Sequence, residues 1–268
     1  EIINEYRKRK ESNFSSSNVK GLKRNISAFN SRLSWRCHFI QKLEDQPDIE
    51  FKSMHSAYEG IRDNFNNEFF FKSWMEGKTG FPIVDACMRS LIKTGWLPFR
   101  MRAMLVSFAS YNLLIDWKKS GTYLAKLFTD FEPGIHYSQM QMQSGVTGIN
   151  AVRIYNPIKQ SYDQDPEGTY IRKWVDELRF VHKAYIHEPW KMSSDLQEKF
   201  KCKIGTDYPN PIIDQKESSK FAKNLIYSVR KSKNFKENSA KVFNKLGSRK
   251  NISSKKRFSQ MKIRINFL

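Results

Sequence analysis

Apolar residues recur at helical spacing along most of the chain, and no stretch alternates apolar and polar positions as the strands of a hairpin would. Segment 82–94 is the clearest helix. It opens with Pro82 and is followed by Gly95, which suit the first turn of a helix and the position after its last turn. Its apolar stripe consists of Ile83, Val84, Cys87, Met88, Leu91 and Ile92. This pattern predicts a helix that packs on one side.

Segment 100–117 is apolar almost all round, which a helix tolerates only when other elements cover several of its faces. We therefore expect this segment at the centre of the domain. The periodicity predicts further helices over 31–45, 53–61, 67–76, 121–130, 168–180 and 218–231. The fold class predicted from these patterns is all-α.

Composition divides the chain into three parts. Residues 12–25 are rich in Ser, Asn and Lys and indicate a linker, so 1–25 is predicted to be a short N-terminal helix and a polar linker. The folded domain is expected over 26–232. Residues 233–268 mix Lys, Arg, Ser and Asn and are predicted to be a basic, flexible tail, with one helix around 237–246.

The net charge of +20 is concentrated at the two ends. Residues 1–36 carry +6 and residues 216–268 carry +14, while the body between them is about neutral. A basic segment beside a neutral body favours a polyanionic partner such as DNA, because each neutralised phosphate releases counterions. A lysine-rich tail that only solubilises the protein is the alternative.

The three cysteines, Cys37, Cys87 and Cys202, lie far apart and form no C-x-x-C pair. This spacing argues against a disulfide framework, a zinc site or a four-cysteine iron–sulfur cluster, so no metal is expected and a reducing cytoplasm fits best. The longest apolar stretch, 103–115, is interrupted by polar residues and is too short to span a bilayer. No membrane partner is expected, and the predicted location is cytoplasmic.

One run of residues carries a resemblance to a known family. Segment 74–91 (WMEGKTGFPIVDACMRSL), followed by Thr94-Gly-Trp, resembles the signature of the photolyase/cryptochrome flavin domain. The similarity continues in the same order through LIDW at 114–117, RIYNP at 153–157, DPEGTYIRKW at 165–174, EPW at 188–190 and YPNPI at 208–212. The resemblance implies an all-helical domain that binds FAD.

In that family an α/β antenna domain precedes the helical domain, and a Ser/Thr-rich loop binds the FAD phosphates. Counterparts of both would lie upstream of residue 1, so neither is evident in this sequence. FAD is therefore the expected cofactor, with its retention depending on how the phosphates are held. A partner chain that supplies the antenna domain is one option.

The resemblance assigns four residues to the cofactor. Arg102 and Asp130 match a pair beside the flavin ring, where a reduced flavin anion requires a fixed positive charge. Glu132 stands where the family has a second acidic contact. His136 falls at the position that faces flavin N5, where better-known members carry Asn, Asp or Cys, and it could hydrogen-bond or protonate that atom. The alternatives are a structural ion pair and a polar histidine of the core.

The resemblance also assigns an electron-transfer chain. Trp74 and Trp117 match its outer and middle tryptophans, but Met140 occupies the flavin-proximal position. Methionine forms no aromatic radical, so this relay is interrupted, and Tyr137 is the alternative donor considered. Core packing explains Trp74 and Trp117 equally well.

The lesion-binding positions depart further from the family. In pyrimidine-dimer repair enzymes these positions hold an acidic residue, an aromatic platform, an Asn, an Arg and a second Trp. Here they align, in that order, with Arg32, Trp35, Phe99, Arg100 and Met142. Only Trp35 and Arg100 keep the family's residue types.

Two other positions complete the predicted DNA-binding set. Arg36 adds a third arginine around Trp35, and Gln160 belongs to the same predicted set. Pro98 and Phe99 stand where (6-4) repair enzymes carry histidines, which disfavours that chemistry. Arginines that grip phosphates around an indole that stacks a base suit damaged or single-stranded DNA, although surface arginines covering apolar neighbours are an alternative.

Three hypotheses about function follow. The first is a DNA-binding, photolyase-like flavoprotein that repairs pyrimidine photoproducts by light-driven electron transfer from reduced FAD. The second is a non-catalytic module for nucleic-acid binding or blue-light signalling, which the changes at Arg32, Phe99, Met140 and Met142 favour. The third is a fragment that needs a partner chain.

Overall fold

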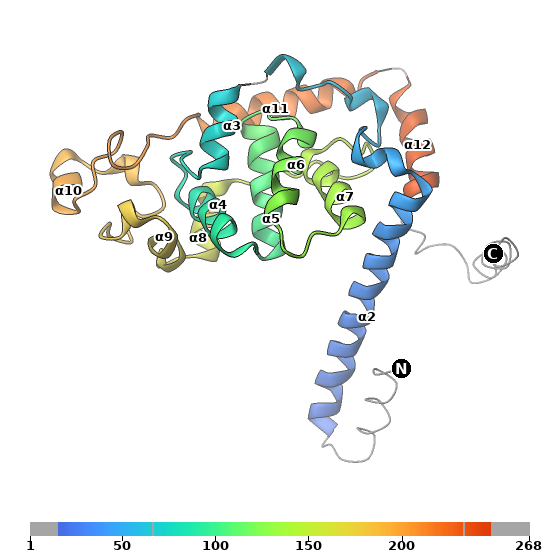
Figure 1. The fold of residues 1–268 in the computed structure, drawn as a ribbon, viewed down its shortest axis with the longest axis horizontal. Helices are drawn as coiled ribbons and strands as arrows, with labels where there is room; N and C mark the ends of the chain where they lie inside the picture. The colour runs from blue at the N-terminus through green and yellow to red at the C-terminus, as the bar shows by residue number, and fades with distance from the viewer. Residues whose placement is uncertain (1–15, 66, 233, 248–268) are drawn as a thin grey trace, which may run out of the picture.

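The computed structural model describes residues 16–65, 67–232 and 234–247, and these residues contain α-helices and no β-strand (Figure 1). The prediction of an all-α fold is confirmed. The helices are α2 (Ser16–Asp45), α3 (Glu68–Met75), α4 (Pro82–Thr94), α5 (Phe99–Ser107), α6 (Trp117–Leu127), α7 (Pro133–Ser144), α8 (Pro157–Gln164), α9 (Thr169–Trp174), α10 (Ser194–Lys199), α11 (Gln215–Val229) and α12 (Phe235–Leu246).

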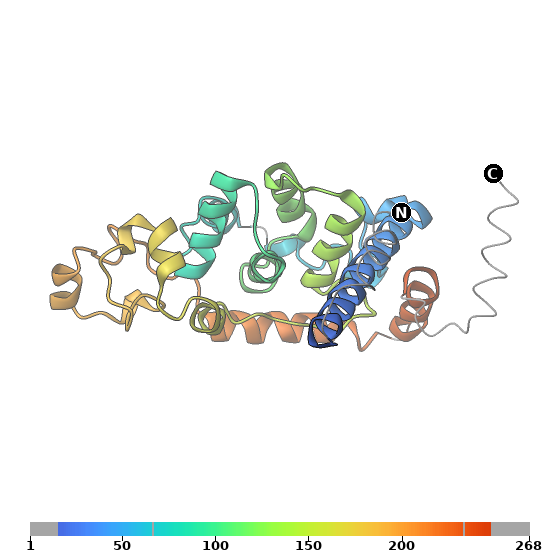
Figure 2. The ribbon, with the colours of Figure 1, turned by 90° about the horizontal axis from the view of Figure 1, so that it is seen from below.

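Helix α5 occupies the centre of the domain and contacts α4, α6 and α7, while α11 runs below it (Figure 2). Its residues Met104 and Leu105, and Phe108 just after it, are fully buried. Helix α7 packs against three neighbouring helices, α2, α5 and α6. This arrangement places α7 between the core and the long helix α2.

Helix α4 has the bounds that its sequence predicts. It starts at Pro82, and Gly95 ends it in the left-handed conformation with φ of 70°. The Gly95 amide donates to the carbonyl of Leu91 at 2.7 Å. Glycine closes the helix here because a side chain would strain this backbone conformation.

The apolar segment 100–117 is central and buried, as predicted, but it is not one helix. Helix α5 passes into a π-helical turn, Phe108–Asn112, and the helical path ends there. The Asp116 carboxylate accepts a hydrogen bond from the Lys118 amide at 2.8 Å and caps the start of α6. An N-cap residue must be extended, so the chain leaves the helix before Asp116 and starts a new one at Trp117.

The predicted linker is wrong where the structure can be compared, because residues 16–25 belong to α2. Apolar residues at Leu22, Ile26, Phe29 and Leu33 continue the helical spacing through this polar segment, and its lysines favour a helix. Figure 1 shows the first half of α2 extending away from the other helices. Residues 1–15, with the predicted short N-terminal helix, lie outside the described residues.

The other predicted helices differ in how well they match. The structure confirms helices within 31–45, 67–76 and 218–231, as α2, α3 and α11. The segment predicted over 121–130 begins earlier, in α6, and the segment predicted over 168–180 contains the short α9 and one 3-10 turn. The helix predicted over 53–61 is reduced to the 3-10 turn Ser56–Tyr58.

The hydrogen bonds within this segment explain the lost helix. The Tyr58 amide donates to the carbonyl of His55 and the Glu59 amide to that of Ser56, each at 3.0 Å and each three residues back, as in a 3-10 turn. Gly60 then adopts a left-handed φ of 71°, which stops the turn from continuing as an α-helix.

The predicted tail begins with an ordered helix. Helix α12 is confirmed near the predicted range 237–246, and it is docked on the domain rather than flexible. The Phe235 ring stacks on His55 at 4.3 Å, and Leu246 packs with Ile49 and Met54. Residues 248–268 lie outside the described residues. Within the described part of the chain, no helix has both the length and the apolar character needed to cross a membrane.

Candidate functional site

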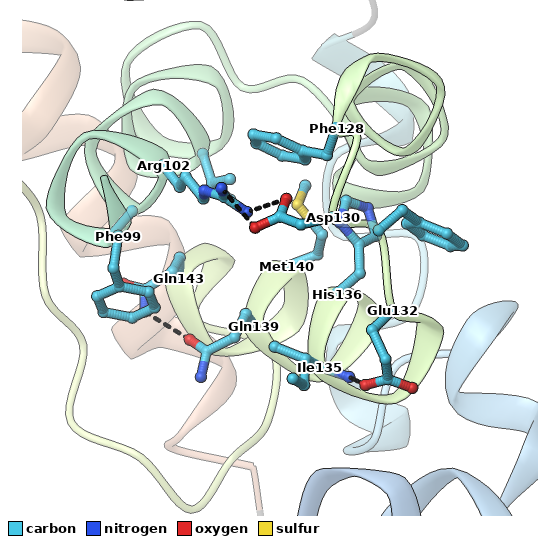
Figure 3. A pocket seen from close by; sticks show the side chains of 13 residues that line it. Phe99, Arg102, Phe128, Asp130, Glu132, Ile135, His136, Gln139, Met140 and Gln143 are labelled. Atoms are coloured by element: carbon cyan, nitrogen blue, oxygen red, sulfur yellow. Dashed lines mark hydrogen bonds and ion pairs between the residues drawn. The ribbon is translucent and has the colours of Figure 1, made fainter. Parts of the chain in front are cut away.

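Arg102 and Asp130 form the predicted pair. Arg102 comes from α5 and Asp130 from the loop between α6 and α7, and two parallel hydrogen bonds of 2.9 Å join the guanidinium to the carboxylate (Figure 3). The Arg102 Nε donates to the carbonyl of Leu97 at 2.6 Å, and the guanidinium lies 4.2 Å from the centre of the Phe128 ring. Three sets of contacts therefore fix the direction of this cation.

His136 is buried in α7 and held as a neutral imidazole. Its Nε2 lies 2.9 Å from the carbonyl oxygen of Gly121 on α6, and because a carbonyl can only accept, Nε2 carries the proton. Burial lowers the pKa of His136, and the positive charge of Arg102 adds to this effect, while the bond to Gly121 opposes it. The remaining ring nitrogen, Nδ1, is left as an acceptor.

These residues surround a cavity of about 150 Å³ between α5 and α7. Arg102, Asp130 and His136 line it together with Met140, while Phe128 and Val106 supply apolar walls (Figure 3). Glu132 also lines the cavity, but its carboxylate caps α7 by accepting from the Gly134 and Ile135 amides at 3.2 and 2.9 Å. The four residues that sequence assigns to a cofactor thus meet at one cavity.

A second cavity of about 480 Å³ adjoins the first. Phe99, Ile135 and Gln139 line both cavities, so the two share a wall. The larger one contains most of the predicted lesion-binding residues, namely Arg32, Trp35, Arg36, Phe99 and Met142. These side chains come from α2, α5 and α7, which explains why segments far apart in the sequence meet here.

Four predicted site residues do not line either cavity. Arg100 is exposed at the start of α5, and Gln160 is buried on α8. Trp117 is buried and donates to the Ser53 hydroxyl at 3.2 Å. Trp74, the predicted outer member of the relay, is 0 % exposed and packs beside Phe71 and Tyr123 with ring centres 6.2 and 6.0 Å away.

The sequence reasoning missed several residues that line the larger cavity, and Lys42 and Phe243 are two of them. Lys42 lies seven positions after Trp35, two turns along the same face of α2, and that spacing is a signal that could have identified it. Phe243 comes from α12 and is exposed toward the cavity. No sequence pattern connects α12 to this site, because its position depends on tertiary packing.

Residues 29–228 match the family model for the FAD binding domain of DNA photolyase. The chain belongs to this family. A deoxyribodipyrimidine photo-lyase from Alkalihalophilus pseudofirmus is 39% identical over 197 residues, which are 72% of this chain and 41% of that protein. This chain therefore spans less than half the length of that photo-lyase.

Solved structures of the family have the same fold. A bacterial class III photolyase from Agrobacterium tumefaciens matches with a TM-score of 0.71 and 32% identity, over 78% of this chain and 44% of that one. An archaeal photolyase from Sulfolobus tokodaii, determined with two FAD molecules, matches with a TM-score of 0.67 and 30% identity, over 75% and 44% of the two chains. The resemblance read from the sequence is confirmed by these matches.

The residues of the smaller cavity fit a flavin ring chemically. Its walls combine apolar side chains with the Arg102–Asp130 ion pair, the Glu132 carboxylate that caps α7, and the imidazole of His136. A planar, largely apolar ring system that becomes anionic on reduction requires such a lining. Among the described residues, no group of three or more His, Cys, Asp or Glu side chains is arranged to hold a metal ion.

Proposed function

We propose that this chain is the flavin-binding domain of a photolyase-type protein that binds damaged or single-stranded DNA. The observation that carries this proposal is the wall shared by the two cavities, through Phe99, Ile135 and Gln139. A nucleotide in the larger cavity would lie beside a flavin in the smaller one. Reduced FAD, when bound, supplies an electron under light.

The chain's own residues have distinct roles in this proposal. Arg102, held by Asp130, keeps a positive charge fixed beside the ring, and His136 offers an acceptor nitrogen without adding charge. Trp35 gives the larger cavity a stacking face, while Arg32 and Arg36 supply positive charge for phosphates. Apolar residues such as Phe128 and Val106 exclude water from the smaller cavity.

The larger cavity favours an anionic occupant. Its lining includes Arg32, Arg36 and Lys42 and no Asp or Glu. A cavity with several cations, no carboxylate and an indole face is suited to a nucleotide that has left the base stack. The type of lesion is left open, because only Trp35 and Arg100 keep the family's residue types and Arg100 is outside the cavity.

A non-catalytic binding or light-signalling module is the second candidate, and Met140 favours it. This side chain lines the smaller cavity at the place assigned to the flavin-proximal tryptophan. Without an aromatic group there, photoreduction through the usual relay would fail, although binding of FAD and DNA could persist. Chemical reduction of the flavin bypasses this step and separates the two candidates.

The test uses protein reconstituted with FAD, reduced chemically, and illuminated with DNA that contains a pyrimidine dimer. The first candidate predicts light-dependent repair and tighter binding of damaged than intact DNA. The variant Trp35→Ala should lose the preference for damage, whereas Trp96→Ala, which removes an exposed tryptophan that lines neither cavity, should keep it. Binding of FAD and DNA without repair would support the second candidate. Absence of flavin uptake would refute both flavin-dependent candidates.

The C-terminal charge can be tested separately. Residues 248–268 contain seven Lys and Arg and no Asp or Glu, and they follow the last described helix. If they contact phosphates, their removal should reduce the slope of log K against log salt by up to about 6 for duplex DNA. An unchanged slope would contradict a role of this segment in DNA binding. The salt dependence would then come from charged residues nearer the cavity.

A further inference from the structure

Lys42 is a buried lysine that has no ion-pair partner among the described residues. Its side chain lines the larger cavity, and the residue is 8% exposed. The described residues provide no hydrogen bond or ion pair to its Nζ, which lies 5.3 Å from the centre of the Phe39 ring. Burying an ammonium without a counter-ion is costly, so the position demands an explanation.

None of the described residues that line the larger cavity with Lys42 carries a carboxylate, and Asp45 lies one turn further along α2, outside this lining. The charged and titratable groups that line the cavity with it are Arg32, Arg36 and His38, all from α2. The lining residues from α7 are Ile135, Gln139 and Met142, and those from α12 and its end are Phe243 and Gly247, none of which is charged. The cavity therefore contains an amine, two guanidinium groups and no anion of its own.

Burial shifts this lysine toward its neutral form. Loss of solvent lowers the pKa of Lys42 to about 8, so about a tenth of this side chain is free amine at pH 7 and about half at pH 8. Desolvated lysines with a lowered pKa are the ones that proteins use to form imines with carbonyl compounds. Lys42 therefore has a partly neutral, nucleophilic amine and lines a cavity large enough for a sugar.

We propose that Lys42 forms an imine with the aldehyde of an abasic deoxyribose in DNA. The neutral amine attacks C1′ of the ring-opened sugar, a carbon–nitrogen bond forms, and the carbonyl oxygen leaves as water with the two amine protons. No oxidant or reductant is consumed. The proposal depends on the proposed DNA binding and on neither flavin nor light.

The cavity favours this carbonyl over others. Arg32 and Arg36 would hold the phosphates on either side of the sugar, and Trp35 offers its face to a neighbouring base. A nucleotide without a base leaves space in a cavity of about 480 Å³ for the sugar to reach Lys42. Among DNA lesions, an abasic site presents an aldehyde at this place.

The experiment is reductive trapping on the full chain. Protein is mixed with a duplex oligonucleotide that carries one abasic site, sodium borohydride reduces any imine, and mass spectrometry of peptides identifies the modified lysine. We expect a covalent adduct on Lys42. The variant Lys42→Arg keeps the positive charge but lacks a nucleophilic amine, and its adduct should fall at least tenfold. Lys93→Arg, which alters an exposed lysine outside both cavities, should match the wild type.

Two controls separate binding from chemistry. An oligonucleotide with a tetrahydrofuran site, which lacks the aldehyde, should bind with similar affinity to wild type and Lys42→Arg but give no adduct. Because exposed lysines keep higher pKa values, the yield at Lys42 should rise about fivefold from pH 7 to pH 8, following the free-amine fraction of a group with pKa about 8. Circular dichroism checks that each variant is folded.

The outcomes distinguish this inference from the proposed function. Wild-type protein that binds neither oligonucleotide refutes both. Binding without an adduct, or an adduct spread over exposed lysines and unchanged in Lys42→Arg, overturns the imine and leaves DNA binding intact. Equal trapping but weaker tetrahydrofuran binding in Lys42→Arg would assign Lys42 to holding phosphate and also overturn the imine.

Discussion

Helix α7 approaches the backbone of α2 closely at Gly134, and replacing this glycine should force the two helices apart. A Cβ atom at Gly134 would lie 2.8 Å from the carbonyl oxygen of Phe39 and 3.0 Å from the Cα of Ile40. Both are backbone atoms of α2, which cannot rotate away as a side chain could. The helices would have to separate by roughly 0.6 Å before the contact with oxygen reached the ordinary 3.4 Å.

The expected cost of Gly134→Ala follows from two opposing terms. Overpacking a well-filled contact costs about 1–3 kcal/mol. Against this cost, alanine stabilises a helix by up to about 1 kcal/mol relative to glycine, and by less in the first turn, where Gly134 lies. We therefore expect the free energy of unfolding to fall by about 1–2 kcal/mol. Because α2 carries Trp35 and α7 carries Met142, the same shift should widen the larger cavity and weaken DNA binding.

Guanidinium denaturation followed by far-UV circular dichroism measures the change in stability, and fluorescence anisotropy measures DNA binding. The matched control is Gly21→Ala on α2, where a Cβ meets nothing within 4 Å, so the variant should be neutral or about 0.5–1 kcal/mol more stable. If Gly134→Ala were as stable as the wild type and bound DNA equally well, the close α2–α7 contact would not control the cavity.

Three further predictions test other parts of the structure. Burial lowers the pKa of His136 below its usual 6.5, so the contribution of neutral His136 to the stability of the fold should be complete above about pH 6.5 and lost as the pH falls. The denaturation midpoint of His136→Asn should therefore depend less on pH between pH 5 and 7 than that of the wild type. Asp85 is buried and accepts from the Thr79 amide and hydroxyl at 2.8 and 2.6 Å, from the Gly80 amide at 3.1 Å and from the Tyr208 hydroxyl at 2.5 Å, so Asp85→Asn should cost about 3 kcal/mol and Tyr208→Phe about 1 kcal/mol in urea unfolding. If Phe243 stacks a base, Phe243→Ala should weaken binding of single-stranded oligonucleotides by about tenfold, while the exposed Phe180→Ala should leave it unchanged.

Local sequence signals predict the start and end of a helix where the residues that determine them act within one turn. Helix α4 begins at Pro82 and ends before Gly95 because both residues act within one turn of the backbone. Arg102 and Asp130 are 28 positions apart, yet they were paired correctly because the family resemblance carried their long-range contact. Composition alone would not have joined them.

Other features depend on contacts that no local pattern contains. The segment 53–61 has helical spacing, but it forms only the 3-10 turn Ser56–Tyr58, and its Met54 amide is bound by the side chain of Gln141, far along the chain. Helix α7 was not predicted, since its mixture of polar and apolar residues follows from burial against three neighbours rather than one. The polar residues at 16–25 suggested a linker because serine and asparagine are frequent there, although the apolar spacing continued beneath them.

Helix α12 follows the family domain, which ends at residue 228, yet its Phe243 forms part of the wall of the larger cavity. A Cβ at Gly247 would lie 2.3 Å from the carbonyl oxygen of Phe243 and 2.9 and 3.1 Å from two of its ring atoms, so a side chain at 247 would disturb both the end of α12 and that ring. The smaller cavity takes no residue from α12. Substitutions in α12 can therefore change which molecules the larger cavity admits while the lining of the smaller cavity stays the same, so selection can tune ligand choice separately from cofactor chemistry.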